Sequence, residues 1–146
     1  MKVAAFLEHH AYAPVLVGPD ETIAEAARRI SEKHKGLACV SDPDGNFLGV
    51  ISVIDIGRAL GEHGGACAEK PVSQFMNPGA ITCEPKAPIE TVRDLMQEHE
   101  IRHVPVVDGG KLVGLINIRD VLHCFVEQDA ADIDFLRSFV FGIGYH

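Results

Sequence analysis

Basic residues are scarce in this 146-residue sequence: Lys and Arg number 13 against 21 Asp and Glu, so the formal net charge is −8. Proteins that bind nucleic acid or an anionic membrane surface need a cationic face. The charge balance therefore counts against both partners. Hydrophobic residues make up 47% of the chain, which is ample material for a packed interior.

Long apolar runs and paired cysteine motifs are also missing. No run approaches the ~20 residues of a membrane span, and Met1–His10 lacks the apolar core of a signal peptide. None of the cysteines has a C-x-x-C spacing, which favours free, buried thiols over a disulfide framework. They are Cys39, Cys67, Cys83 and Cys124. We therefore expect a cytoplasmic protein.

Catalytic and metal motifs are absent or incomplete. The sequence has no G-x-S-x-G element and no P-loop. His99 and His103 have the spacing of a zinc pair, but Ile101 and the strand-like sequence at His103 indicate that the helix has ended, and no third ligand is suitably placed. Cys67 lies near His63 without a third group to position a base. We expect no enzyme, no metal and no required cofactor.

One seven-residue stretch occurs twice and organises the chain. Gly49-Val50-Ile51-Ser52-Val53-Ile54-Asp55 reappears 65 residues later as Gly114-Leu115-Ile116-Asn117-Ile118-Arg119-Asp120. Each copy follows an apolar run and leads into helix-like sequence. Each predicts a strand that ends in a polar residue, with an Asp three positions further on in the first turn of a helix.

The flanking sequence extends these copies into two β-α-β-β-α repeats. In the first, we predict strands over 14–17, 37–41 and 47–52 and a helix over 53–60. Thr22 and Glu25 have capping-box spacing before another helix, which has an apolar face from Ile23 to Ile30. In the second, we predict strands over 81–83, 103–107 and 112–117, a helix after Pro88, and a helix over 118–128.

The repeats set the predicted domain boundaries. Residues 1–61 form a first unit with an N-terminal helix, 62–72 a Gly-rich linker, 73–128 a second unit, and 129–146 an apolar C-terminal extension. The extension is too apolar to hang in water, so it caps the core or forms a subunit contact. The adjacent His9 and His10 point in different directions and are expected at a solvated helix end.

At these residues the sequence resembles the CBS domain family in its tandem form, the Bateman module. The resemblance rests on the two repeats, on the paired G-h-x-S/T-x-x-D elements, and on Arg102–Val107 before the second hairpin. It implies an α/β (α+β) fold, the CBS-pair fold, with two units packed sheet to sheet in pseudo-twofold symmetry. It also implies two clefts that take adenosine-containing ligands such as AMP, ADP, ATP or S-adenosylmethionine.

Carried over from the family, Asp55 and Asp120 contact ribose hydroxyls, while Ser52 and Asn117 lie near ribose or phosphate. The predicted first site comprises Pro14, Val15, Gly36, Leu37, Ala38, Ser52, Ile54 and Asp55. The predicted second site comprises Ile81, Thr82, His103, Val104, Pro105, Asn117, Arg119 and Asp120.

Physical chemistry supports this assignment and also offers an alternative. A carboxylate only accepts hydrogen bonds, so it can take both vicinal hydroxyls of a ribose, and a helix N-terminus favours a phosphate. Ser52-x-x-Asp55 and Asn117-x-x-Asp120 also have the spacing of helix caps, which need no ligand. Arg102, His103 and Arg119 surround one predicted cleft, so we expect the second site to be the better phosphate site.

The resulting hypothesis is a regulatory module that senses an adenosyl nucleotide, couples the energy state of the cell to an effector protein on another chain, and forms a homodimer through its helices, as pairs in this family often do. The alternative is a structural or oligomerisation module that binds no nucleotide, in keeping with the departure of Asn117 from the motif. A hydrolase would need a convergent nucleophile, base and orienting group, and the sequence shows none.

Overall fold

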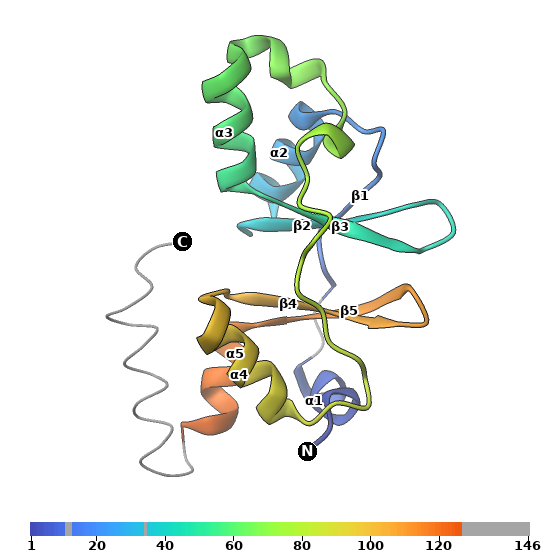
Figure 1. Cartoon of the computed structure of the whole chain (residues 1–146), viewed down its shortest axis with the longest axis vertical. Coiled ribbons are helices and arrows are strands. Elements are labelled where there is room, and N and C mark those ends of the chain that lie inside the picture. The colour runs from blue at the N-terminus through green and yellow to red at the C-terminus, as the bar shows by residue number, and fades with distance from the viewer. Residues whose placement is uncertain (11–12, 34, 127–146) are drawn as a thin grey trace. The chain divides into compact units, whose positions relative to one another are not determined.

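The computed structural model describes residues 1–10, 13–33 and 35–126. The chain forms two compact units, each with one copy of the repeat (Figure 1). The repeat-one unit comprises residues 13–80 with 109–112, and the repeat-two unit comprises the described parts of 1–12, 81–108 and 113–146. The predicted C-terminal extension, 129–146, lies outside the described residues. Within them, no helix is long and apolar enough to cross a bilayer.

The repeat-one unit is a three-stranded sheet with two helices on one face (Figure 1). Its strands are β1 (Leu16–Val17), β2 (Leu37–Ser41) and β3 (Phe47–Ser52), and its helices are α2 (Ile23–Glu32) and α3 (Val53–His63). Strand β1 runs parallel to β2, and β2 runs antiparallel to β3. The predicted bounds of β2 and β3 are confirmed.

Helix α2 begins where the sequence predicts. The Thr22 hydroxyl oxygen accepts a hydrogen bond from the Glu25 amide at 3.2 Å, which satisfies one of the free N–H groups of the first turn. Ile23, Ala26 and Ile30 lie on one face and are buried in the repeat-one core. The helical spacing of the apolar residues therefore predicted both the helix and its buried face.

The predicted linker is a folded part of the repeat-one unit. Helix α3 runs to His63, and 3-10 helices η1 (Gly64–Glu69) and η2 (Val72–Gln74) follow. Gly64 turns the chain at the end of α3 with a φ of 63°, a conformation that glycine adopts at little cost. Cys67 is 3% exposed within the core, and the Val72 amide donates to the Glu21 carbonyl at 2.8 Å. The paired glycines therefore mark a turn.

The repeat-two unit has a smaller sheet. It contains α4 (Ile89–His99), the hairpin of β4 (His103–Asp108) and β5 (Lys111–Asn117), and α5 (Ile118–Phe125). The strand predicted at 81–83 is reduced to one parallel bridge between Cys83 and Val106. Only two described strands therefore form this sheet, whereas the first repeat has three.

The N-terminal helix α1 (Val3–His10) belongs to the repeat-two unit, contrary to the predicted first unit of residues 1–61. The Val3 amide donates to the Ala87 carbonyl at 2.8 Å, and the Ala4 amide donates to the Pro85 carbonyl at 3.0 Å. Val3 and Phe6 are buried in the repeat-two core. The sequence predicted an N-terminal helix, but a local pattern of apolar residues does not reveal which unit the helix packs on.

Candidate ligand-binding site

In the repeat-one unit, the strand directions bring most of the predicted first site to one end of the sheet. The start of β2 meets the end of β3, because Leu37 pairs with Ser52 in register. The Val53 amide donates to the Gly36 carbonyl at 3.0 Å, and the Cys39 amide donates to the Val15 carbonyl at 2.8 Å. Residues far apart in sequence thus lie together at the N-terminus of α3.

Ser52 and Asp55 form a closed capping box at that terminus. The Asp55 amide donates to Ser52 Oγ at 3.1 Å, while Asp55 Oδ2 accepts from the Ser52 amide at 2.8 Å and from the Ser52 hydroxyl at 2.9 Å. Asp55 Oδ1 pairs with Arg58 Nη1 at 3.4 Å. The capping alternative is therefore realised, and one carboxylate oxygen is already committed to the fold.

The other predicted first-site residues divide by exposure. Ile54 is 49% exposed beside Asp55 and offers apolar surface at the helix N-terminus. Pro14 is partly exposed, whereas Val15 and Ala38 are core residues at 7% and 0% exposure. Val15 and Ala38 can therefore offer a ligand mainly their backbone groups.

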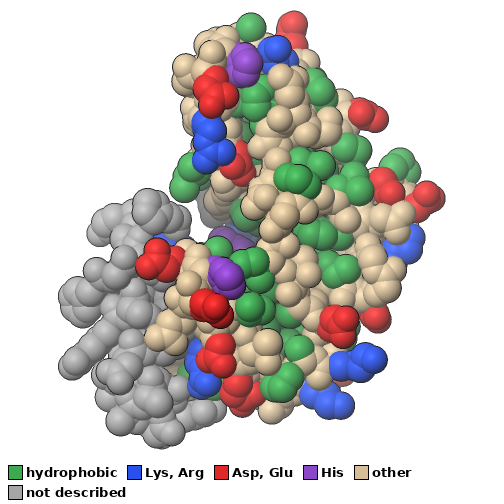
Figure 2. Space-filling view, in the orientation of Figure 1, with side chains coloured by type: hydrophobic (Ala, Val, Ile, Leu, Met, Phe, Trp, Pro, Cys, Tyr) green, Lys and Arg blue, Asp and Glu red, His purple; other side chains and the backbone are tan. Residues whose placement is uncertain are grey.

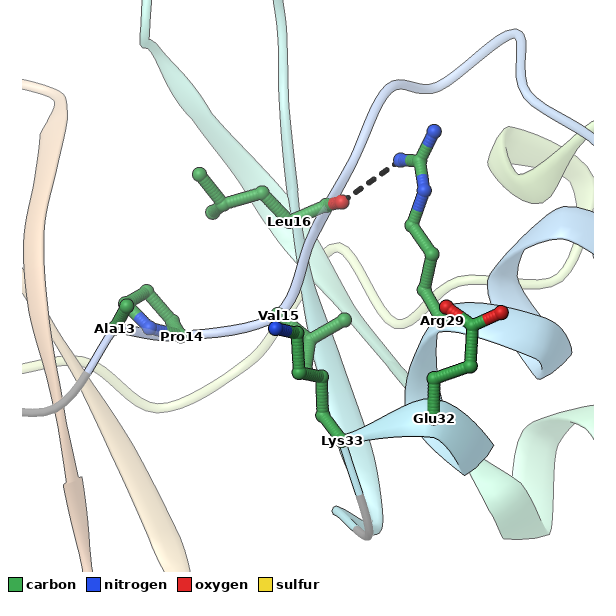
Figure 3. A pocket seen from close by; sticks show the side chains of 7 residues that line it. All are labelled: Ala13, Pro14, Val15, Leu16, Arg29, Glu32 and Lys33. Atoms are coloured by element: carbon green, nitrogen blue, oxygen red, sulfur yellow. Dashed lines mark hydrogen bonds between the residues drawn. The ribbon is translucent and has the colours of Figure 1, made fainter.

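A hollow of about 310 Å³ opens beside the start of β1. Figure 3 shows its lining side chains, which come from the start of β1 and the segment before it and from the C-terminal end of α2. The hollow shares Pro14 and Val15 with the predicted site but is not lined by Ser52 or Asp55. The lining residues are Ala13, Pro14, Val15, Leu16, Arg29, Glu32 and Lys33.

Arg29 is fixed in this hollow, and the sequence analysis did not single it out. Its guanidinium donates to the Leu16 carbonyl at 2.9 Å and to both carboxylate oxygens of Glu21. The hydrogen bond from Arg29 holds the pKa of Glu21 below its ordinary value. Glu21 precedes α2 and lies eight residues from Arg29, so helical spacing gave no signal for the pair.

The repeat-two unit has the corresponding arrangement. The Ile118 amide donates to the Arg102 carbonyl at 2.8 Å, which joins the start of β4 to the N-terminus of α5. The Cys83 amide donates to the Pro105 carbonyl at 3.0 Å and places the segment containing Ile81 and Thr82 beside β4. The three segments that carry the predicted second-site residues are thus joined by backbone hydrogen bonds.

Asn117 caps α5, but its partner acid is held differently. Asn117 Oδ1 accepts from the Asp120 amide at 2.9 Å. Asp120 does not return a bond to the cap backbone, so its carboxylate is outside the cap. Within the described residues, its partner is His10, whose Nδ1 lies 3.9 Å from Asp120 Oδ1. Motif spacing could not reveal His10, because it lies on the N-terminal helix.

The remaining second-site residues differ in what they expose. Val104 and Pro105 are buried, His103 is partly buried, and Arg119 is exposed. On the face that Figure 2 presents, acidic and basic side chains are interspersed across the described residues without a broad cationic field. On this face, a phosphate would therefore meet individual cations rather than a broad basic surface.

Metal and thiol chemistry find little support in these units. Helix α4 ends at His99 and Glu100 turns the chain at a φ of 54°, so His99 and His103 do not share a helix. Within the described ranges, no group of three or more His, Cys, Asp or Glu could hold a metal ion. Cys39, Cys67 and Cys83 are buried free thiols, and burial raises the pKa of the Cys39 and Cys83 thiols to about 12.

Comparison with known proteins identifies the repeats. The CBS domain model matches residues 10–62 and 72–127. The CBS-domain containing protein ATU1752 from Agrobacterium tumefaciens is 31% identical, with a TM-score of 0.75 over 85% of this chain and 98% of that one.

Two similar structures hold ligands. PAE2072 from Pyrobaculum aerophilum, complexed with AMP, is 29% identical, with a TM-score of 0.73 over 94% of this chain and 99% of that one. The CBS domain pair of protein MJ0100, in complex with 5′-methylthioadenosine and S-adenosyl-L-methionine, is 25% identical, with a TM-score of 0.73 over 88% of this chain and 98% of that one. The family resemblance is confirmed, and the chain belongs to the CBS domain family, with two copies of the domain in tandem.

Proposed function

We propose that the chain is a regulatory module that binds an adenosine-containing nucleotide, and that the Asn117–Asp120 element is its stronger site. AMP, ADP, ATP and S-adenosylmethionine are the candidate ligands, since similar structures hold AMP or S-adenosylmethionine. The single observation that carries the proposal is the Asp120 carboxylate. It stands at a helix N-terminus, outside the cap hydrogen bonds, with its side chain 24% exposed.

This carboxylate suits the ribose of such a ligand. Two oxygens without a cap bond can accept both vicinal hydroxyls. The positive end of the α5 dipole and the exposed Arg119 next to Asp120 favour a phosphate on the same ligand. In the repeat-one unit, the equivalent of Arg119 is Ile54, so that site offers apolar surface instead of a cation.

A thermal-shift screen of the purified chain tests the proposal. The panel is AMP, ADP, ATP, S-adenosylmethionine, NAD and GTP. A ligand at 100 times its dissociation constant should stabilise the fold by ~2.7 kcal/mol, which is several degrees for a chain of this size. Stabilisation by adenosyl ligands that is lost in Asp120→Ala supports the proposal. A folded protein that responds to none of them contradicts it.

The signal is proposed to pass to an effector protein, with a homodimer as the working form in the cytoplasm. Helix α3 supports the dimer, since Val53, Ile54 and Leu60 are each about half exposed, at 53%, 49% and 54%. Exposed apolar surface of this kind favours association. Sedimentation of Leu60→Glu tests the dimer: a shift to monomer supports α3 as the contact.

The same helix supports the alternative of an oligomerisation module without a nucleotide. In that case, Leu60→Glu would change the mass of the assembly while no ligand on the panel shifted the melting temperature. Nucleotide binding that survives in the monomer would instead leave ligand binding as the primary function.

A further inference from the structure

Helix α1 ends at the proposed second site, at a histidine predicted to be merely solvated. The His10 ring stacks on Phe6, with ring centroids 4.4 Å apart and an interplanar angle of 22°. Phe6 is 1% exposed and part of the repeat-two core. A buried anchor therefore fixes the ring, and its Nδ1 lies 3.9 Å from Asp120 Oδ1.

The comparison with Asp55 shows why this placement matters. The capping box and Arg58 orient both oxygens of Asp55. Asp120 receives no such bonds from its cap, and among residues 1–10, 13–33 and 35–126 its carboxylate lies beside the His10 ring. A carboxylate that must accept two hydroxyls at once needs a fixed orientation, because ordering it at the moment of binding costs affinity.

We propose that His10 is a positioning residue of the second site, which steers the Asp120 carboxylate toward the vicinal hydroxyls of a ribose. This inference rests on the proposed function. Nδ1 can donate in one neutral tautomer and in the imidazolium. At 3.9 Å it attracts Oδ1 without a direct hydrogen bond, so the lone pairs of both oxygens stay available to the sugar.

Calorimetric titration of the full chain with AMP and with 2′-deoxy-AMP tests this role. If His10 acts through Asp120 on the hydroxyls, His10→Ala should weaken AMP binding about three- to tenfold, the range for one polar interaction. Its effect on 2′-deoxy-AMP should be much smaller. The preference for the ribonucleotide therefore falls. A purely structural role would weaken both ligands equally.

Three further variants sharpen the test. His9→Ala removes the neighbouring exposed histidine of the same helix and should leave the preference unchanged. His10→Asn keeps an N–H donor near the place of Nδ1 and should restore most of the preference. His10→Leu keeps an apolar contact for Phe6 while removing the donor, so it should behave like His10→Ala even if the alanine variant folds poorly.

The outcomes separate this inference from the proposed function. AMP binding that is abolished by Asp120→Ala, with a preference unchanged in His10→Leu, overturns the positioning role alone. Equal weakening of both ligands in His10→Leu also overturns it. A wild-type chain that binds no AMP, or an Asp120→Ala variant that binds it normally, overturns both proposals.

Discussion

The two repeats place the same acid at the same helix position but use it differently. In repeat one, Ser52 Oγ accepts from the Asp55 amide and Asp55 Oδ2 accepts from the Ser52 amide, so the box closes. In repeat two, Asn117 Oδ1 accepts the Asp120 amide and the carboxylate returns no bond to the cap. Equivalent helix starts thus hold one acid within a closed capping box and leave the other acid outside the cap hydrogen bonds.

The repeats also differ in what covers their strands. A Cβ at Gly49 would lie 2.4 Å from the Asn77 carbonyl oxygen, because the Val50 and Asn77 backbones are hydrogen-bonded there. A Cβ at Gly114 would lie 2.9 Å from Leu7 Cδ1 of helix α1. The first contact is with rigid backbone and the second with the end of a side chain, so equivalent glycines carry unequal constraints.

The largest predicted effect follows from these glycines. Gly49→Ala should destabilise the chain by roughly 3 kcal/mol, since backbone must move to admit the methyl group. Gly114→Ala should cost about 1 kcal/mol, because Leu7 can change rotamer. Urea denaturation of both variants measures the difference. Equal losses of unfolding free energy would show that the Asn77 backbone and the Leu7 side chain yield equally to a methyl group.

Replacing Asp55 or Asp120 by alanine should give the next largest difference in stability between the repeats. Asp55→Ala should lower the free energy of unfolding by about 1 kcal/mol, because it breaks the bonds of a capping box. Asp120→Ala should lower it by less than about 0.5 kcal/mol, the usual range for a residue without such bonds. Chemical denaturation without ligand checks this contrast. A larger loss in Asp120→Ala would assign that acid to the fold.

Glycine substitutions at the C-terminal ends of the equivalent helices α2 and α4 should change the stability of the chain in opposite directions. Glu100 closes α4 at a φ of 54°, whereas Lys33 closes α2 at −92°. Glu100→Gly should therefore stabilise the chain by about 0.5–1 kcal/mol, because glycine adopts the left-handed region without strain. Lys33→Gly should destabilise it by a similar amount. The melting temperatures of both variants show the direction of each change, and a Lys33→Gly variant that melts above the wild type would contradict the prediction.

The ion pair between Glu21 and Arg29 should make the stability of repeat one depend on pH in acid, and repeat two has no equivalent pair. Glu21 and Arg29 correspond to Ala87 and Leu95 in repeat two, so the ion pair has no counterpart there. The pKa of Glu21 is lowered by Arg29 from its ordinary value of 4.5. Its contribution is therefore present above pH 4.5 and is lost as pH falls through the lowered pKa of the folded state.

Glu21→Gln should accordingly reduce stability at pH 7 by less than about 1 kcal/mol, and the gap from wild type should close in acid. Denaturation midpoints across this pH range check the prediction. In an Arg29→Met background, the same substitution should have little effect. A stability difference between the wild type and Glu21→Gln that does not change with pH would contradict this role of Glu21.

The sequence predicted local features well. The bounds of β2 and β3 followed from apolar runs of strand length, and the Thr22 cap followed from capping spacing, both of which are local features of the sequence. Helix caps at Ser52 and Asn117 were predicted as an alternative to ligand binding, and the structure shows both of these caps. Local periodicity and capping therefore determine where these elements begin and end.

Long-range relations could not be predicted in the same way. The apolar face of α1 did not reveal that it packs on repeat two, and nothing in the spacing of His10 linked it to Asp120. Arg29 was also missed, because its partners Glu21 and Leu16 lie on other segments. Each of these contacts depends on tertiary packing, which a local pattern does not encode.

Asp120 is proposed to hold a ribose in the stronger site, and this role is central to the proposed function. Calorimetric titration of AMP into the wild-type chain, Asp55→Ala and Asp120→Ala measures this. We predict that Asp120→Ala abolishes the tighter binding event while Asp55→Ala retains it. Loss of the tighter event in Asp55→Ala alone, or AMP binding that neither variant changes, would contradict the account.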